Sequence, residues 1–151
     1  MIAFERTRDF ALIRSLIASD ARVYDAASDD GCPAACAFAP NRHPAIWYVL
    51  AREGGELAGM FTLIPQNACC WEIHMGRVFG APGRALGEIP RWAFQTIPGC
   101  RRIVASLRVT NRVAIRAAKR AGFVEYGRNP RSLLKGGQLL DQILLGVSAG
   151  Q

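Results

Sequence analysis

The sequence lacks any long apolar segment. None of its hydrophobic runs reaches the roughly 18 residues that a helix needs to cross a membrane. The N-terminal stretch, MIAFERTRDF, carries charges at positions where a secretory signal peptide needs its apolar core. We therefore expect a cytoplasmic protein that does not associate with a membrane.

The sequence also lacks a framework for disulfides or structural zinc. Its five cysteines are an odd number, and without an export signal they argue against disulfide pairing. Cys32 and Cys36 have a spacing that suits a metal ion, but the adjacent Cys69 and Cys70 make a poor second pair for zinc. We expect free thiols and no bound metal.

Acidic side chains are scarce in the second half of the chain. Residues 1–72 carry six basic and nine acidic side chains, whereas residues 73–151 carry thirteen basic and three acidic ones. Such a basic half suggests a nucleic acid, a small ligand with several phosphates, or simply a solvated surface. No RNA-binding aromatic motif, zinc finger or helix-turn-helix signature is present, which makes a nucleic-acid partner the weaker interpretation.

What is present suffices for one ordinary domain. Half of the 151 residues are hydrophobic, and no internal repeat or low-complexity segment divides the chain. Apolar spacing predicts a first helix over residues 7–19 with Thr7 as its N-cap, followed by a long loop over residues 28–45. Three strands near residues 46–51, 57–64 and 69–78 then form an antiparallel meander.

The second half of the chain alternates strands and helices. A glycine-rich loop at residues 80–85, GAPGRA, precedes a helix whose start Pro90 would delay to near Gly87. A strand at 102–109, a helix opened by Asn111, and two strands at 123–126 and 139–147 joined by a Gly136-Gly137 turn complete the order. This order predicts an α/β fold with a mixed, mostly antiparallel sheet flanked by helices.

The glycine-rich loop is a candidate phosphate site. At a helix start several backbone N–H groups point one way, and the helix dipole adds a partial positive charge. Glycine lets a phosphate approach closely, and the Arg84 guanidinium can pair with a phosphate oxygen. The alternative is a plain strand-to-helix turn.

A second motif, NRVAIRAAKRAGF, occupies residues 111–123. Here the chain resembles the GNAT acetyltransferase superfamily, whose members place an Asn at the start of this helix, a small residue three positions later and a Gly-Phe pair after it. The matching residues are Asn111, Ala114, Gly122 and Phe123. The resemblance covers roughly residues 46–147 and implies a GNAT fold, acetyl-CoA as cofactor, and transfer of acetyl to an amine of a small molecule or protein.

The resemblance also implies a cofactor site. In the family's R/Q-x-x-G-x-G/A loop, which holds the pyrophosphate, the last three positions correspond here to Gly83-Arg84-Ala85, and Gly80 stands where Arg or Gln is usual. A register beginning at Arg77 would instead end on Pro82. The pantetheine arm would pair with the strand around Met75, and Asn111 would contact the cofactor near the thioester. The implied cofactor-binding residues are Ile73, Met75, Arg77, Gly80, Gly83, Arg84, Ala85 and Asn111. A basic cluster can attract the adenosine phosphates or be an ordinary solvated helix face; its members are Arg108, Arg112, Arg116, Lys119 and Arg120.

Acetyl transfer benefits from a general base and from a proton donor for the leaving thiolate. Family members often carry a Glu on the cofactor strand, which makes Glu72 one candidate. His74 is the other, because histidine exchanges protons near neutral pH. Strand alternation places both on one face, where they are either catalytic or a polar surface pair. The family's frequent acid, a Tyr, is replaced by Ala118, so water or Tyr126 would protonate the thiolate, or catalysis is lost.

Two alternatives therefore stay open. One is a catalytically degenerate GNAT-fold protein with a binding or structural role, which Ala118, the atypical loop and Pro90 favour. Some phage-encoded proteins have similar WEIH-like strands, so a phage or prophage origin belongs to this alternative. The other is a basic nucleic-acid-binding module. No motif identifies the amine acceptor or an interface for the homodimers that occur in this superfamily.

Overall fold

One seven-stranded sheet organises the chain, with strand order β1-β2-β3-β4-β5-β7-β6. The computed structural model describes the backbone of residues 1–78 and 82–150 and the side chains of residues 1–74 and 83–150. The strands are β1 (Ile2–Thr7), β2 (Trp47–Glu53), β3 (Glu56–Pro65), β4 (Cys70–Val78), β5 (Arg102–Arg108), β6 (Val124–Lys135) and β7 (Gln138–Ser148). The helices are α1 (Phe10–Ala18), α2 (Ala21–Ala27), the 3-10 turn η1 (Ala35–Ala37), α3 (Pro82–Thr96) and α4 (Arg112–Arg120). The predicted α/β fold with a mostly antiparallel sheet is confirmed.

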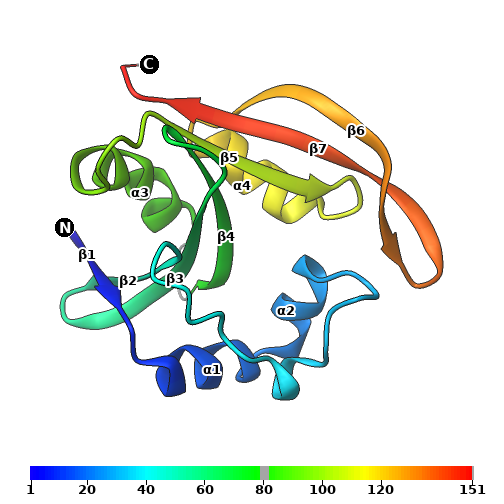
Figure 1. Cartoon of the computed structure of the whole chain (residues 1–151), viewed down its shortest axis with the longest axis horizontal. Coiled ribbons are helices and arrows are strands. Elements are labelled where there is room, and N and C mark those ends of the chain that lie inside the picture. Colours follow the sequence, from blue (N-terminus) through cyan, green and yellow to red (C-terminus); the bar gives the residue numbers. More distant parts are fainter. Residues whose placement is uncertain (79–81, 151) are drawn as a thin grey trace.

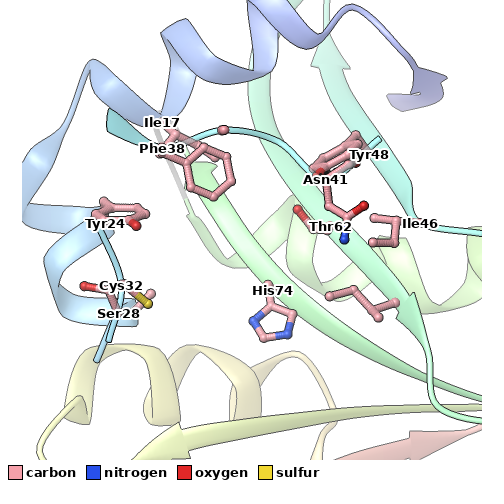
Figure 2. A pocket seen from close by; sticks show the side chains of 13 residues that line it. Ile17, Tyr24, Ser28, Cys32, Phe38, Asn41, Ile46, Tyr48, Thr62 and His74 are labelled. Atoms are coloured by element: carbon pink, nitrogen blue, oxygen red, sulfur yellow. Dashed lines mark hydrogen bonds between the residues drawn. The ribbon is translucent and has the colours of Figure 1, made fainter. Parts of the chain in front are cut away.

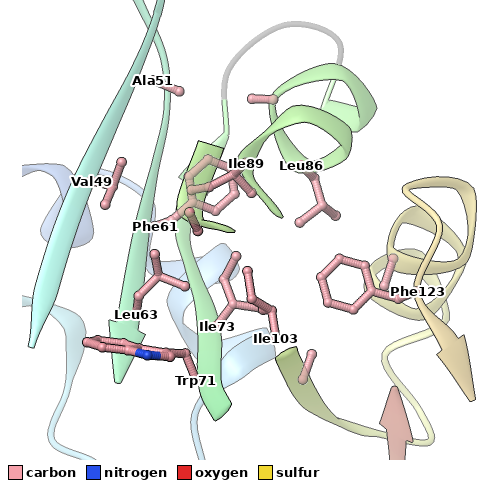
Figure 3. Packing of buried hydrophobic residues seen from close by; sticks show 14 of the residues in the cluster. Val49, Ala51, Phe61, Leu63, Trp71, Ile73, Leu86, Ile89, Ile103 and Phe123 are labelled. Carbon is pink, nitrogen blue, oxygen red and sulfur yellow. The ribbon is translucent and has the colours of Figure 1, made fainter. Parts of the chain in front are cut away.

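The sheet lies between two helical layers, and residue alternation in β2 explains why. Tyr48 and Leu50 point to one face, where they pack with Ile13 and Ile17 of α1. Val49 and Ala51 point to the other face, which α3 and α4 cover (Figure 1). The larger core lies on this second face and centres on fully buried residues such as Phe61, each contributing roughly 1.5–3 kcal/mol through burial (Figure 3). Both faces of the sheet are therefore buried over its central strands.

The N-terminal segment differs from the prediction. Residues 2–7 form strand β1, which pairs with β2 from Ile2–Glu53 to Thr7–Tyr48. Helix α1 starts later, and Asp9 rather than Thr7 is its N-cap, with the carboxylate accepting a bond from the Leu12 N–H at 3.0 Å. The alternation of IAFERT is too short to distinguish an edge strand from a helix start, so only the pairing with β2 decides it. Helix α2 was not predicted either.

Helix α3 begins at Pro82, not near Gly87 as predicted. Proline suits the first helical position because its missing N–H would have no partner there. Pro90 lies buried inside the helix, where it removes one backbone hydrogen bond. The buried face formed by Leu86, Ile89 and Ala93 holds the helix against the sheet in spite of that loss. Residues 83–85 are thus the first turn of a helix rather than part of a loop.

Strands β4 and β5 separate soon after they begin. They run parallel, and among the described residues they pair only over Cys70–Glu72 and Arg102–Val104. Beyond Glu72 the two strands diverge (Figure 1), while β4 stays paired with β3 up to Val78. The β3–β4 register shifts between Met60 and Phe61, so that Gly76 is an extra residue in β4. The sheet therefore opens between β4 and β5 on the side toward α3.

The last two strands form a hairpin that is longer than predicted. β6 continues to Lys135 instead of ending near Tyr126, and the Gly136-Gly137 turn appears as expected with φ values of 59° and 73°. The hairpin tip reaches the segment after α2. The Lys135 ammonium lies 2.7 Å from the Asp25 carboxylate, and the Gly136 and Gly137 N–H groups donate to Asp30 at 2.8 and 2.9 Å. Residues 25–30 are thereby fixed to the far end of the sheet.

Candidate functional site

The opening between β4 and β5 leaves one edge of β4 free. Past Glu72, the backbone N–H and C=O groups that face β5 have no strand partner among the described residues. Such groups form hydrogen bonds with whatever approaches them. Ile73 offers only its backbone here, because its side chain is 7% exposed in the core. Met75 and Arg77 continue the strand.

The start of α3 lies beside the end of this edge. The first N–H groups of a helix have no intrahelical partner, and here they belong to Gly83 and Arg84, because Pro82 has none. A Cβ at Gly83 would meet no atom within 4 Å, so open space surrounds this position. Ala85 faces the core at 2% exposure and can contribute only its backbone. The predicted site residue Gly80 lies outside the described residues.

The Arg84 side chain has partners of its own. Its guanidinium pairs with Glu53 at the end of β2, and its Nε atom lies 3.5 Å from Glu88 one turn along α3. These two carboxylates offset the positive charge of the Arg84 guanidinium, which the sequence analysis expected to pair with a phosphate. Arg84 would have to leave Glu53 before it could pair with an anion.

Asn111 is the N-cap of α4. Its side-chain oxygen accepts a bond from the Ala114 N–H at 3.2 Å, and its amide nitrogen donates to the Ala26 carbonyl of α2 at 3.3 Å. At the other end of α4, Gly122 has a φ of 90° and Phe123 is buried in the core. The motif therefore has structural roles, which join α4 to α2 close to the end of β5.

Glu72 and His74 share one face of β4, as predicted. His74 pairs across the sheet with Thr62, and Glu72 pairs with Ile64. Glu72 Oε1 lies 3.6 Å from His74 Nε2, while Glu72 Oε2 accepts a bond from Gln66 at 2.9 Å. The Glu72 side chain is 22% exposed and His74 is 52% exposed. Gln66, which no sequence pattern singles out, thus orients the carboxylate beside the histidine.

His74 borders a cavity of about 310 Å³ on the α1–α2 side of the sheet. The cavity lies between β2, β3 and β4 and the segment from α2 to the start of β2. Its lining comprises Ile17, Tyr24, Ala27, Ser28, Cys32, Phe38, Ala39, Asn41, Ile46, Tyr48, Thr62, Ile64 and His74. Figure 2 shows the His74 ring projecting toward the space between these walls. The arrangement exposes a titratable nitrogen to a small, mostly apolar chamber.

Two tyrosines that line the cavity, Tyr24 and Tyr48, were not among the proton donors expected from the sequence. Burial raises the pKa of Tyr24, and the nearby Cys32 and Asp29 raise it further. Burial also raises the pKa of Tyr48, whose hydroxyl donates to the Asn41 carbonyl at 3.1 Å. Tyr126 is wrongly placed for this role, since it lies half-exposed on β6 beneath the Arg102 guanidinium and does not line the cavity. Ala118 packs into the core at 5% exposure, so its position does not reach the cavity.

The basic residues of α4 lie mainly on its solvent face. Arg112, Arg116, Lys119 and Arg120 line a shallow groove beside Ile143 of β7, and Lys119 pairs with Glu125 at 2.9 Å. Arg108 differs from them, because its Nε atom is buried with no hydrogen-bond partner. Within the described part of the chain, no three His, Cys, Asp or Glu side chains gather as a metal site. In that same part, no helix has the length and apolar character of a membrane span.

Comparison with known sequences finds no matching protein-family model and no matching curated protein. Solved structures do match. A spermidine N-acetyltransferase from Vibrio cholerae, solved with CoA and spermine, has a TM-score of 0.73 at 17% identity, covering 97% of this chain and 95% of that one. RimJ from Mycobacterium smegmatis, solved with CoA-disulfide, has a TM-score of 0.71 at 18% identity, covering 98% and 82%.

A GNAT-family acetyltransferase from Streptococcus pneumoniae matches at a TM-score of 0.66 and 14% identity, covering 99% of this chain and 100% of that one. Identities this low establish the fold and leave the activity to be argued from the site. The fold implied by the resemblance at residues 111–123 is confirmed.

Proposed function

Because this chain has the fold of the GNAT N-acetyltransferases, we propose that residues 1–151 form one acetyltransferase domain that transfers acetyl from acetyl-CoA to a primary amine. The observation that carries the proposal is the divergence of β4 from β5 beside the start of α3. This geometry brings a free strand edge, unpaired helix N–H groups and the Glu72–His74 pair onto one stretch of chain. A plain structural sheet would gain nothing from that opening.

The residues at the opening fit an elongated ligand that ends in phosphates. The free edge of β4 from Ile73 to Arg77 would pair with the amide groups of the pantetheine arm. The N–H groups of Gly83 and Arg84 would bind the pyrophosphate, helped by the dipole of α3 and by the open space at Gly83. Asn111 would contribute its remaining hydrogen-bonding capacity near the end of β5. Gly80 and Ala85 would contribute backbone alone.

Bound acetyl-CoA supplies a thioester, whose carbonyl carbon forms a C–N bond with the amine as the C–S bond breaks and the thiolate leaves. The proton released by the amine passes to His74, and Glu72 stabilises the imidazolium that results. Nε2 is the ring atom nearest Glu72, which leaves Nδ1 to receive this proton. A backbone N–H on the free edge of β4 would stabilise the oxyanion.

Binding of acetyl-CoA, measured by titration calorimetry, tests the proposal. We expect micromolar affinity for the unmodified protein and a loss of at least tenfold (about 1.4 kcal/mol) in Gly83→Asp, because a carboxylate at the start of α3 repels a phosphate. Gly87→Asp is the matched control. It adds the same charge to the same helix at a position that also has open space around it. It should bind nearly as well as the unmodified protein.

Absence of binding at millimolar acetyl-CoA would overturn the proposal and favour a second candidate, a GNAT-fold binding protein without catalysis. That candidate has specific support in the burial of Ala118 and in the engagement of Arg84 by Glu53 and Glu88. Binding of acetyl-CoA without any turnover on a panel of amines would also favour it.

A further inference from the structure

The cavity beside His74 has walls of one chemical character. Its described lining contains three aromatic rings, three isoleucines and two alanines, and it contains no Asp, Glu, Lys or Arg. Tyr24 and Phe38 meet edge to face, with ring centroids 5.8 Å apart, and form a continuous aromatic wall. The polar groups of the lining are the hydroxyls of Tyr24 and Tyr48 and five further side chains: Ser28, Cys32, Asn41, Thr62 and His74. A ligand here meets a surface suited to an uncharged body.

The carboxylates near the cavity already have partners. Asp25 pairs with Lys135, and Asp30 accepts from two glycine N–H groups of the β6–β7 turn. Asp29 accepts from the Gly31 N–H at 2.7 Å, and Glu72 accepts from Gln66. A polyamine carries several ammonium groups, and each one that leaves water needs a counter-charge or hydrogen-bond acceptors. Among the described residues, no carboxylate lines the cavity itself to meet a second or third ammonium.

Two polar side chains of the lining, those of Thr62 and His74, lie together on the sheet wall of the cavity. His74 and Thr62 are directly paired across β3 and β4, and the Glu72–His74 pair adjoins them. One amine nitrogen can lie there, beside the group that would take its proton. The whole cavity, with a volume of about 310 Å³, lies at the small end of the roughly 300–1,000 Å³ range of ligand pockets. It therefore suits a ring or a short aliphatic chain.

From these features we infer that the acceptor is a primary amine carried on an uncharged, apolar body, such as an arylalkylamine, rather than a polyamine. The inference rests on the proposed function, because it names the substrate class of the same site. A primary amine on an apolar body occurs both in free small molecules and at the N-terminal residue of a peptide. In either case the apolar body lies against Tyr24 and Phe38, and the nitrogen lies at His74.

The test compares acceptors at saturating acetyl-CoA, with the acetylated product quantified by mass spectrometry. The acceptors are phenethylamine, spermidine and a short peptide with an N-terminal Phe. We expect kcat/KM for phenethylamine to exceed that for spermidine by at least about tenfold, the discrimination typical of an apolar pocket. Acetylation of the peptide in place of phenethylamine would also support the inference, and it would identify the acceptor as the N-terminus of a polypeptide.

Two variants locate the effect in the cavity. Phe38→Ala removes part of the aromatic wall and should lower kcat/KM for phenethylamine by about tenfold without changing acetyl-CoA affinity. Ala39→Asp places a carboxylate at an exposed position of the lining and should shift the preference toward spermidine. Val124→Asp, which adds the same charge at a 62% exposed residue of β6, is the control and should leave the preference unchanged.

Failure of the inference and failure of the proposed function give different results. If acetyl-CoA does not bind, the proposed function fails. If acetyl-CoA binds and spermidine is acetylated faster than both apolar amines, only the substrate class is wrong. If acetyl-CoA binds and none of the three acceptors is acetylated, the inference and the proposed catalysis both fail. Ala39→Asp keeps the inference falsifiable if Phe38→Ala does not fold. Unchanged preferences in a folded Ala39→Asp variant would also overturn it.

Discussion

Glu72 and His74 lie two residues apart on β4, and their separation of 3.6 Å is held by a third residue, Gln66. Half of the His74 side chain is exposed, whereas Glu72 is more enclosed. A carboxylate in this position fixes the orientation of an imidazole and stabilises its protonated form. At the scale of single residues, the proposed chemistry therefore depends mainly on His74.

Replacing His74 by Gln should lower kcat by at least about 100-fold, because the amine loses its proton acceptor. Acetyl-CoA affinity should stay the same. Glu72→Gln should have a smaller effect of the same kind. The control is His43→Gln, since His43 is the other histidine of the chain and accepts a bond from the Ala45 N–H in an exposed turn. Full turnover in both β4 variants would remove them from the mechanism.

At the scale of elements, the β6–β7 hairpin fixes one wall of the cavity. Its tip binds Asp25 and Asp30, and the cavity residues Ala27 and Ser28 lie between them. The Ser28 hydroxyl also lies 3.4 Å from Lys135. Four strands lie between β2 and β6 in the order of the sheet, so the hairpin tip connects distant parts of the fold to one segment. Weakening the contacts of the hairpin tip should therefore impair binding of the amine and leave binding of acetyl-CoA unchanged.

Lys135→Ala should raise KM for the amine several-fold and leave acetyl-CoA affinity unchanged, because it releases Asp25 without touching β4 or α3. Steady-state kinetics with both substrates measures the two effects separately. Arg128→Ala is the control on the same strand, since Arg128 forms an ion pair with Asp141 at 3.6 Å away from the tip. An equal loss of affinity for both substrates would point to general destabilisation instead.

The same contacts predict a pH dependence of stability. Hydrogen bonds from the Gly137 and Gly136 N–H groups lower the pKa of Asp30 below its ordinary value of 3.8, and the bond from Lys135 lowers the pKa of Asp25. A lowered pKa stabilises the fold above 3.8, and this contribution is lost as the pH falls through the folded value. Asp30→Asn should therefore lower the denaturation midpoint at neutral pH and have little effect in strong acid. An undiminished difference in acid would contradict the assignment.

At the scale of the whole molecule, one thiol reports on the integrity of the fold. Cys100 is fully buried between the end of α3 and the start of β5, and burial raises the pKa of its thiol to about 11. Cys32, Cys36 and Cys69 are exposed. The thiolate is the reactive form of cysteine, so both burial and the raised pKa suppress labelling of Cys100.

We expect alkylation of the native protein to modify the three exposed cysteines quickly and Cys100 only when the fold opens globally. Peptide mapping by mass spectrometry identifies each site, and the rate at Cys100 should rise steeply near the denaturation midpoint. Labelling of Cys100 at the rate of Cys69 in the native protein would show that the α3–β5 junction opens locally.

Much of the fold follows from local patterns in the sequence. The meander of β2 to β4, the helix opened by Asn111 and the Gly136-Gly137 turn all depend on apolar periodicity, caps and glycine conformations, which act over a few residues. The shared face of Glu72 and His74 follows from strand alternation in the same way. The GNAT resemblance came from such short-range features of residues 111–123, and the fold bears it out.

Tertiary structure alone decided the rest. Pairing with β2 made residues 2–7 a strand, and packing of Leu86 and Ile89 on the sheet let α3 continue past Pro90. Arg84 also pairs with Glu53 of β2, and Asn111 with Ala26 of α2; both partners are far away in the sequence, so no local pattern predicts these two contacts. The cavity beside His74, the proposed acceptor site, is lined by six separate segments of the chain. Its apolar character therefore emerges only when folding brings their side chains together, because binding chemistry depends on neighbours in space and local sequence fixes only neighbours along the chain.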